Sequence, residues 1–494
     1  MPRFSIRSWL NRISTSLRRR QRRTVRSIER LENRLVLSAY SVSSTLDSVD
    51  ANPGDGVAAD VDGNATLRAA VIDANALAGT DTITLGAGLF TMSLGGRNEN
   101  AAATGDLDVS GNLIIEGAGA DQTFLDAALL DRYFHVLPGS SLTLRNVTIR
   151  NGSEVSGGAI QNEGTLVLEN VTLTANSTTI RGGAIYNNQG NVTLQSVNVS
   201  GNQTRDVGPT GGNSSGGALQ SDGGTVTIQA SQFANNSAAA QGGAISATST
   251  NLTVSNTAFS QNSATVGGAV RLFNGTASFT NDTFNGDHGA ISGGAIASNY
   301  CTLTITGGSF TGNYLTALSD FGELRNGGAL YLVGINSSST TATITGVTFQ
   351  QGGSGDGGGI YNSNNRINLS NSTFDHMSGE RGGSIWNTSG GLIVLWNTTF
   401  VGGSGTIGGA ILNSAQMQMT NCTVTNTTST GSVTVPSAAV ANTGSFQSAN
   451  NLIAGNVGGL DVSGAFSGPG GNLIGKRGTA TGFTDASDHV GTSA

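Results

Sequence analysis

The chain has few of the residues on which most globular domains rely. Of its 494 residues, 11% are charged and 5% are aromatic, with 6 prolines and 2 cysteines. So little charge is unusual for a globular enzyme, and disordered chains carry more charge and proline. Cys301 and Cys422 cannot build a disulfide framework or a cysteine-rich metal site, so we expect two small buried residues. No stretch approaches the roughly 20 apolar residues of a membrane span.

Charge is also unevenly distributed. Eleven of the 24 basic residues, all arginines, lie in the first 38 residues beside only Glu29 and Glu32. The other 456 residues carry 13 basic and 29 acidic groups, a net charge of −16. An acidic body with scattered arginines argues against nucleic acid as a partner. We interpret residues 1–39 as a basic targeting segment that is disordered or processed.

Glycine is abundant, at 74 residues, and much of it recurs at a fixed spacing. A unit of two glycines, a small residue and an aliphatic residue has a base period of 25 to 26 residues, and it begins at positions 157, 182, 216, 242, 267, 293, 327, 357, 382 and 408. Such self-similarity is the signature of a solenoid.

Each period contains three short runs in which apolar and polar residues alternate, as in "GGAIYNNQGNVTLQSVNVSGN" from Gly182 to Asn202. Alternation marks half-buried strands, and glycine or asparagine at the joints permits tight corners. The sequence therefore predicts an all-β fold: a right-handed, single-stranded parallel β-helix with three strands per coil and about 11 to 12 coils over residues 136–475. Leucine-rich repeats need a different leucine frame, and propeller blades need about 40 residues.

The repeat resembles the paired GGAI and F-x-x-N repeats of chlamydial polymorphic outer membrane proteins. The second half of the unit reads "FANN" at Phe233, "FSQN" at Phe259 and "FTGN" at Phe310. In addition, "IERLENRLVLSA" (Ile28–Ala39) resembles the LEPR-XLL motif of planctomycete-type surface proteins, with Asn33 in place of its proline. Both resemblances imply a secreted or surface-exposed protein, and the first implies adhesion.

The first part of the body resembles the CSLREA module that opens many bacterial β-helix proteins, on the stretch "ATLRAAVIDANALAGTDTITL" from Ala65 to Leu85. Here Leu67, Ala70, Val71 and Ala74 form one apolar face of a short helix, which we expect to cap the open core of the first coil. Residues 40–135 are thus predicted to be the cap and first coils. Residues 450–475 resemble the closing coils of the same group, and we expect 476–494 to be a polar tail, which is either the end of a truncated chain or an unusual end.

Two ladders follow from the glycine unit. Its asparagine, two residues after the aliphatic position, should point inward. We expect a structural ladder there, because stacked amides hydrogen-bond one another along the axis; its members are Asn362, Asn387, Asn413 and Asn442.

The residue between the aliphatic and the asparagine should point outward. In three successive coils it is Tyr331, Tyr361 and Trp386, which we interpret as an exposed stripe suited to carbohydrate rings, or as rings that only pack on one another. The residues before two successive glycine pairs, Asp356 and Arg381, should lie close enough for an ordinary surface ion pair.

No catalytic or metal site is predicted. β-Helices also include polysaccharide lyases and hydrolases, whose sites need carboxylates brought together from adjacent coils. Here the acidic residues are thinly spread, and two pairs, Asp287-His288 and Asp375-His376, are interpreted as solvated turn residues at equivalent places. One stretch, "GGSGDGGGI" from Gly352 to Ile360, partly matches a calcium nonapeptide that binds metal only in tandem. No cofactor is therefore expected, and Ca²⁺ is only weakly supported.

Together these features predict a monomeric protein that is secreted or lies on the cell surface or outer membrane of a Gram-negative-type bacterium. Its predicted role is adhesive, structural or carbohydrate-binding, with polysaccharide or surface glycan as partner. A polysaccharide lyase or glycoside hydrolase is the main alternative, and a passenger segment of a larger secreted protein is a third.

Overall fold

A computed structural model describes residues 38–97, 99–205, 214–316, 325–337, 340–353, 355–431 and 437–491. They belong to one compact unit, Leu37–Ala494. The arginine-rich segment and most of the LEPR-XLL-like motif lie outside the described residues.

One turn of the chain shows how the sequence pattern becomes a coil. The three predicted runs are strands β15 (Ile185–Asn188), β16 (Asn191–Gln195) and β17 (Asn198–Ser200). A short fourth strand, β18 (Gln203–Thr204), follows them and was not predicted. Each strand pairs in parallel with its counterpart one period later, for example Ile185 with Leu219 and Val192 with Val226. Because each residue pairs with the residue at the same place in the next coil, equivalent side chains lie directly above one another.

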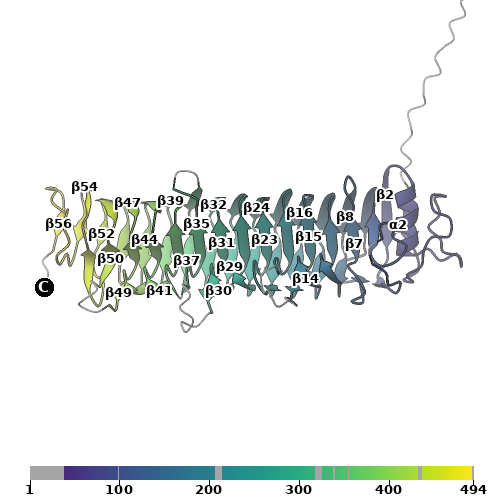
Figure 1. Cartoon of the computed structure of the whole chain (residues 1–494), viewed down its shortest axis with the longest axis horizontal. Helices are drawn as coiled ribbons and strands as arrows, with labels where there is room; N and C mark the ends of the chain where they lie inside the picture. Colours follow the sequence, from purple (N-terminus) through teal and green to yellow (C-terminus); the bar gives the residue numbers. More distant parts are fainter. Residues whose placement is uncertain are drawn as a thin grey trace, which may run out of the picture. The chain divides into compact units, whose positions relative to one another are not determined.

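Repetition of this coil gives a right-handed parallel β-helix of about 13 turns (Figure 1). Sheet A has 16 strands from β1 (Ala39–Val42) to β54 (Ser467–Gly470), and sheet B has 16 from β3 (Gly88–Thr91) to β56 (His489–Val490). Short fourth strands form two sets, β10 (Ser153–Ser156) to β34 (Tyr314–Leu315) and β41 (Ser378–Arg381) to β49 (Thr428–Ser429). Residues 476–491, expected as a tail, include β56, which pairs with β55 (Leu473–Ile474).

Sheet C contains the glycine-unit strands and positions the candidate sites. In order, its 14 strands are β4 (Leu107–Val109), β7 (Phe134–Val136), β11 (Ile160–Asn162), β15, β19 (Leu219–Asp222), β23 (Ile245–Thr248), β27 (Val270–Phe273), β31 (Ile296–Asn299), β35 (Leu330–Val333), β38 (Ile360–Ser363), β42 (Ile385–Asn387), β46 (Ile411–Asn413), β50 (Ala438–Asn442) and β53 (Leu460–Ser463).

The glycine pair is required by the corner that precedes sheet C. Gly182 has a φ of +59°, and a Cβ there would collide with the carbonyl group of Ile185. A Cβ on Gly183 would meet the Gly217 carbonyl of the next coil. The first glycine therefore supplies the backbone conformation, and the second permits close contact between coils.

The core is filled by the apolar positions that point inward. Its most regular feature is a file of stacked rings from sheet B, with centroids 4.6 to 5.2 Å apart, formed by Phe233, Phe259, Phe284, Phe310, Phe349, Phe374 and Phe400. The predicted cap is confirmed as helix α2 (Leu67–Ala76), which is the only helix in the described ranges and buries Leu67, Ala70, Val71 and Ala74 in the core. Cys301 and Cys422 are buried and free, as expected.

Candidate functional site

The outward residues of sheet C form one continuous row, which we name the outer C ladder. Strand register places each member beside the next, in the order Asp108, His135, Gln161, Tyr186, Gln220, Ser246, Arg271, Ala297, Tyr331, Tyr361, Trp386, Leu412 and Ala441. Neighbouring members belong to strands about 4.8 Å apart. The ladder joins the aromatic residues to polar residues near the N-terminal end of the helix.

The three aromatic residues lie next to one another as the register requires. Tyr331 and Tyr361 are stacked with centroids 5.2 Å apart, and Tyr361 meets Trp386 edge to face at 5.3 Å. The expected exposure is wrong for Trp386, which is 8% exposed and packs with Leu412 and Ala441 in a small apolar cluster. The two tyrosines are half-buried. An outward position is thus not an exposed one, because neighbouring coils cover each other's side chains.

The predicted ion pair between Asp356 and Arg381 is confirmed, but it is not an ordinary surface pair. Arg381 donates two hydrogen bonds to the Asp356 carboxylate, at 2.9 and 2.6 Å, and its guanidinium lies 4.1 Å from the Trp386 ring centroid. Asp356 is buried, and burial raises its pKa although the arginine opposes the rise. The pair therefore fixes Arg381 over the aromatic cluster and leaves Asp356 engaged rather than free for Ca²⁺.

A related arrangement occurs at the first copy of the motif. Arg181 lies over Tyr186, and both donate to Asp222 at 3.2 and 3.1 Å. The repeated "RGG" units thus place a cation beside an outward aromatic ring in two distant coils.

The inner asparagine ladder is confirmed. The side-chain amides of Asn362, Asn387 and Asn413 donate to the next asparagine at 2.9, 2.8 and 2.8 Å, ending at Asn442. All four are buried. Each amide also reaches a backbone carbonyl, as Asn387 does to Gln416 at 2.8 Å. The ladder therefore satisfies its buried amide donors and, beyond Asn362 Oδ1 at its start, their acceptors, and it has a structural role.

Sequence reasoning missed a second buried ladder, made by the last residue of the F-x-x-N unit. Its members are Asn176, Asn202, Asn236, Asn262, Asp287 and Asn313. Asp287 stands where its neighbours have asparagine, and Asn262 donates to its Oδ1 at 2.9 Å. Its Oδ2 has no hydrogen-bond partner among the described residues, and burial raises the pKa of this carboxyl to about 7.

The interpretation of the two Asp-His pairs as equivalent solvated turns is therefore wrong. Asp287 lies three residues after Phe284 and is fully buried, whereas Asp375 directly follows Phe374. Asp375 accepts a 2.5 Å hydrogen bond from the exposed ring of His376. In the second pair, His376 is 62% exposed and Asp375 28%. Asp287 differs from Asp375 because only the third position after phenylalanine points into the ladder.

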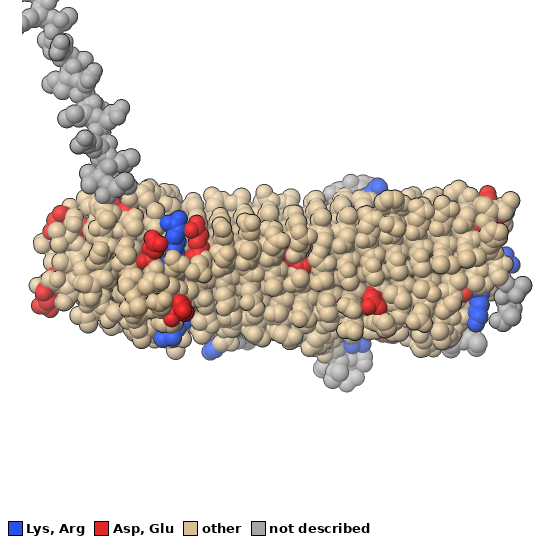
Figure 2. Space-filling model, turned by 180° about the vertical axis from the view of Figure 1, so that it is seen from behind, with Lys and Arg blue, Asp and Glu red and all other residues tan. Residues whose placement is uncertain are grey.

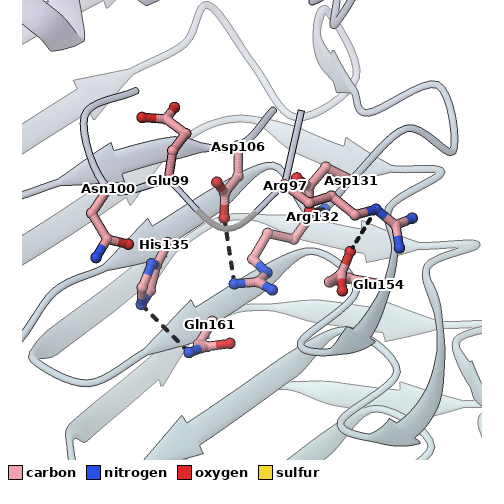
Figure 3. Close-up of a pocket in the computed structure, with 9 residues that line it drawn as sticks. All are labelled: Arg97, Glu99, Asn100, Asp106, Asp131, Arg132, His135, Glu154 and Gln161. Atoms are coloured by element: carbon pink, nitrogen blue, oxygen red, sulfur yellow. Dashed lines mark hydrogen bonds and ion pairs between the residues drawn. The ribbon is translucent and has the colours of Figure 1, made fainter. Parts of the chain in front are cut away.

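A polar cavity lies at the first coils, at the start of the outer C ladder (Figure 3). It has a volume of about 210 Å³ and is lined entirely by polar residues: Arg97, Glu99, Asn100, Asp106, Asp131, Arg132, His135, Glu154 and Gln161. The side chains come from β7, β10, β11 and the segments before β4 and β7. Convergence of the four carboxylates, Glu99, Asp106, Asp131 and Glu154, was not predicted. All four precede the first glycine unit at position 157, so the regular repeat does not indicate which of them lie side by side.

Within this cavity Asp108 positions His135. The Asp108 carboxylate, which is fully buried, lies 3.1 Å from His135 Nδ1 and accepts a hydrogen bond from the Ala102 amide at 3.0 Å. His135 Nε2 faces the Gln161 amide nitrogen at 3.4 Å (Figure 3). An Nδ1–H bonded to Asp108 leaves Nε2 as an acceptor.

Asp106 faces the same cavity and is poorly compensated. Arg132 Nη1 lies 3.4 Å from its carboxylate, and burial raises its pKa to about 7 despite that cation. Asp131, also buried, has a raised pKa for the same reason. Two buried carboxyls with raised pKa values beside an imidazole can exchange protons with a bound molecule or accept a cation.

On the face drawn in Figure 2, charged side chains gather mainly near the two ends and are sparse between them. Among the described residues, no helix is long and apolar enough to cross a membrane.

Comparison with known proteins finds likeness in one repeat and weak likeness in overall structure. Residues 230–248, which contain "FANN" and "GGAI", match the model of the Chlamydia polymorphic membrane protein repeat. No curated protein sequence matches the chain. Two solved structures are similar: the A-module of Azotobacter vinelandii mannuronan C-5 epimerase AlgE4 (15% identity, 86% of this chain and 99% of that chain, TM-score 0.30) and that of AlgE6 (13%, 92% and 98%, TM-score 0.27). These values are too low to bear on the chemistry of the cavity. The chain is thus a parallel β-helix in which one repeat is similar to the polymorphic membrane protein repeat.

Proposed function

We propose that this chain is a non-enzymatic bacterial surface protein that binds a carbohydrate along the outer C ladder. The repeat that matches the chlamydial model supports placement at the cell surface or outer membrane, and the weakly charged β-helix supports a structural or adhesive role.

The observation that carries the proposal is a stacked pair of half-buried rings on this ladder, Tyr331 and Tyr361, whose centroids are 5.2 Å apart. Arg271, also half-buried, lies two positions earlier on the same ladder and offers hydrogen-bond donors. Sugar hydroxyls donate and accept hydrogen bonds, and sugar rings pack on aromatic side chains such as Tyr331 and Tyr361.

Binding to a panel of acidic and neutral polysaccharides tests this proposal. Tyr331→Ala, Tyr361→Ala and Arg271→Gln should each weaken retention of a bound glycan about tenfold. Trp396→Ala provides the matched control, since Trp396 is 49% exposed but lies on sheet A, in β43 (Leu392–Trp396). Equal loss in the control, or no retention of any glycan by the parent protein, would contradict the proposal.

A polysaccharide lyase or glycoside hydrolase is a second candidate, favoured by the carboxylates and imidazole that share the polar cavity. Acid–base chemistry on sugars uses such groups. Incubation with the same panel should then release reducing ends or unsaturated products, and Asp106→Asn should abolish the release. Absence of product from every polysaccharide would leave the binding role alone.

A further inference from the structure

The polar cavity contains more acidic than basic groups. Glu99, Asp106, Asp131 and Glu154 line it against Arg97 and Arg132, and the Asp108 carboxylate lies directly behind His135. Arg132 is near Asp106, and Arg97 is near Glu154 (Figure 3). Two guanidinium groups therefore face four carboxylates, with a fifth behind His135, and the balance favours a cationic ligand over an anion.

Three of these side chains have the arrangement of metal ligands. Asp106, Asp108 and His135 each present one nitrogen or oxygen atom, and all three atoms lie within 4.8 Å of one another. Their side chains are 8%, 0% and 11% exposed. β4 and β7 pair in register, which places Asp108 beside His135. Asp106 directly precedes β4 and, two residues before Asp108, lies on the same face of the sheet.

The carboxylates of the cavity are only partly compensated by the protein. The Asp106 side chain is more than nine-tenths buried, and its one partner among the described residues is Arg132 Nη1 at 3.4 Å. Glu154 Oε2 has the Arg97 Nε at 3.1 Å as an ion-pair partner but accepts no hydrogen bond from the described residues. Buried carboxylates are normally well paired or bound to metal, so the weak compensation of Asp106 indicates that a cation completes the site.

We propose that the cavity binds one divalent first-row transition-metal ion, with His135 Nδ1 and carboxylate oxygens of Asp106 and Asp108 as ligands. The ion replaces the Nδ1 proton that otherwise bonds to Asp108, and this proton passes to solvent. A mixed nitrogen and oxygen set with imidazole suits Zn²⁺ or Mn²⁺, whereas Ca²⁺ takes oxygen ligands only. Water or a bound molecule completes the coordination. This site is independent of carbohydrate binding by the aromatic part of the ladder.

Calorimetric titration of chelator-treated full-length protein with Zn²⁺, Mn²⁺ and Ca²⁺ tests the site. We expect one Zn²⁺ or Mn²⁺ per chain and no heat with Ca²⁺. Asp106→Asn and His135→Gln should each weaken the affinity at least tenfold. The matched controls are Asp375→Asn and His376→Gln, which alter the solvent-exposed Asp-His pair and should leave the affinity unchanged.

Circular dichroism of each variant establishes whether it is folded. If a variant does not fold, the site is tested on the unmodified protein by crystallography. Crystals grown with Zn²⁺ should show an anomalous peak about 2.0–2.1 Å from a His135 ring nitrogen. Binding of Ca²⁺ with equal affinity, a peak elsewhere on the molecule, or unchanged affinity in both folded site variants would each overturn the proposal.

Discussion

Replacing Asp287 with asparagine should stabilise the protein at neutral and alkaline pH. In the second ladder the amides from Asn176 to Asn262 each donate to the next side chain and to a backbone carbonyl, as Asn262 Nδ2 does to Phe233 O at 2.9 Å. Oδ2 of Asp287 occupies the corresponding position but cannot donate once the carboxyl is ionised. Its lack of a partner and its complete burial explain why this carboxyl retains its proton to a pH of about 7.

The magnitude follows from the pKa. The value rises from 3.8 in a free chain to about 7 in the fold, so the folded protein holds the proton more tightly than the unfolded chain does. The resulting stability is fully present below pH 3.8 and is lost as the pH rises to about 7. At 1.36 kcal/mol per pKa unit, the whole loss is about 4 kcal/mol, of which about 2–3 kcal/mol falls between pH 5 and pH 8.

Urea unfolding followed by circular dichroism at pH 5, 6, 7 and 8 measures this loss. Asp287→Asn should flatten the decline by about 2–3 kcal/mol and should exceed the parent protein in stability at pH 8. Asp375→Asn, which changes a carboxyl that is 28% exposed, should leave the profile unchanged. The reasoning fails if Asp287→Asn declines as steeply as the parent protein, or if it is less stable at pH 8.

Three further predictions concern the scaffold. Asn387→Ala should cost about 2–4 kcal/mol in urea unfolding, because Asn362 and Asn413 lose buried partners. The control Asn198→Ala changes an exposed asparagine and should alter stability by under about 0.5 kcal/mol. Similar costs for the two variants would contradict the ladder's role. Gly382 and Gly201 both have a φ of +65°, but a Cβ at Gly382 meets the Ile385 carbonyl and one at Gly201 meets nothing. Alanine at either position should cost backbone strain of about 1–2 kcal/mol. Only Gly382→Ala should lower the melting temperature further than this strain accounts for. In urea unfolding, Trp386→Ala should cost about 2–4 kcal/mol and Trp396→Ala under about 1 kcal/mol. A reversed order would refute the packing assigned to Trp386.

The fold was predictable because the repeat states the same local rule many times. Twelve strands of sheet C, from β11 to β53, agree with the 11 to 12 coils expected. The inner ladder from Asn362 to Asn442 followed from two facts, a side-chain period of two and coils in register. The CSLREA and LEPR-XLL resemblances and the carbohydrate-binding role remain predictions.

The sites were less predictable, for reasons that differ between them. Trp386 was expected in solvent because alternation gives the side of a strand and not what covers that side. Asp287 was misread because its place relative to Phe284, and not its neighbour His288, decides whether it enters the ladder.

By itself, the sequence determined the period, the corners and the inward residues, since each depends on spacing along one coil. Only the tertiary structure decided that Asp106, Asp108 and His135 meet in a cavity, because the first coils lack the regular repeat and the register between β4 and β7 cannot be read from spacing. It also decided which outward side chains are covered, because burial depends on neighbouring coils. Residues that recur in every coil are thus readable from the sequence, whereas sites formed once, between irregular segments, depend on how the chain packs.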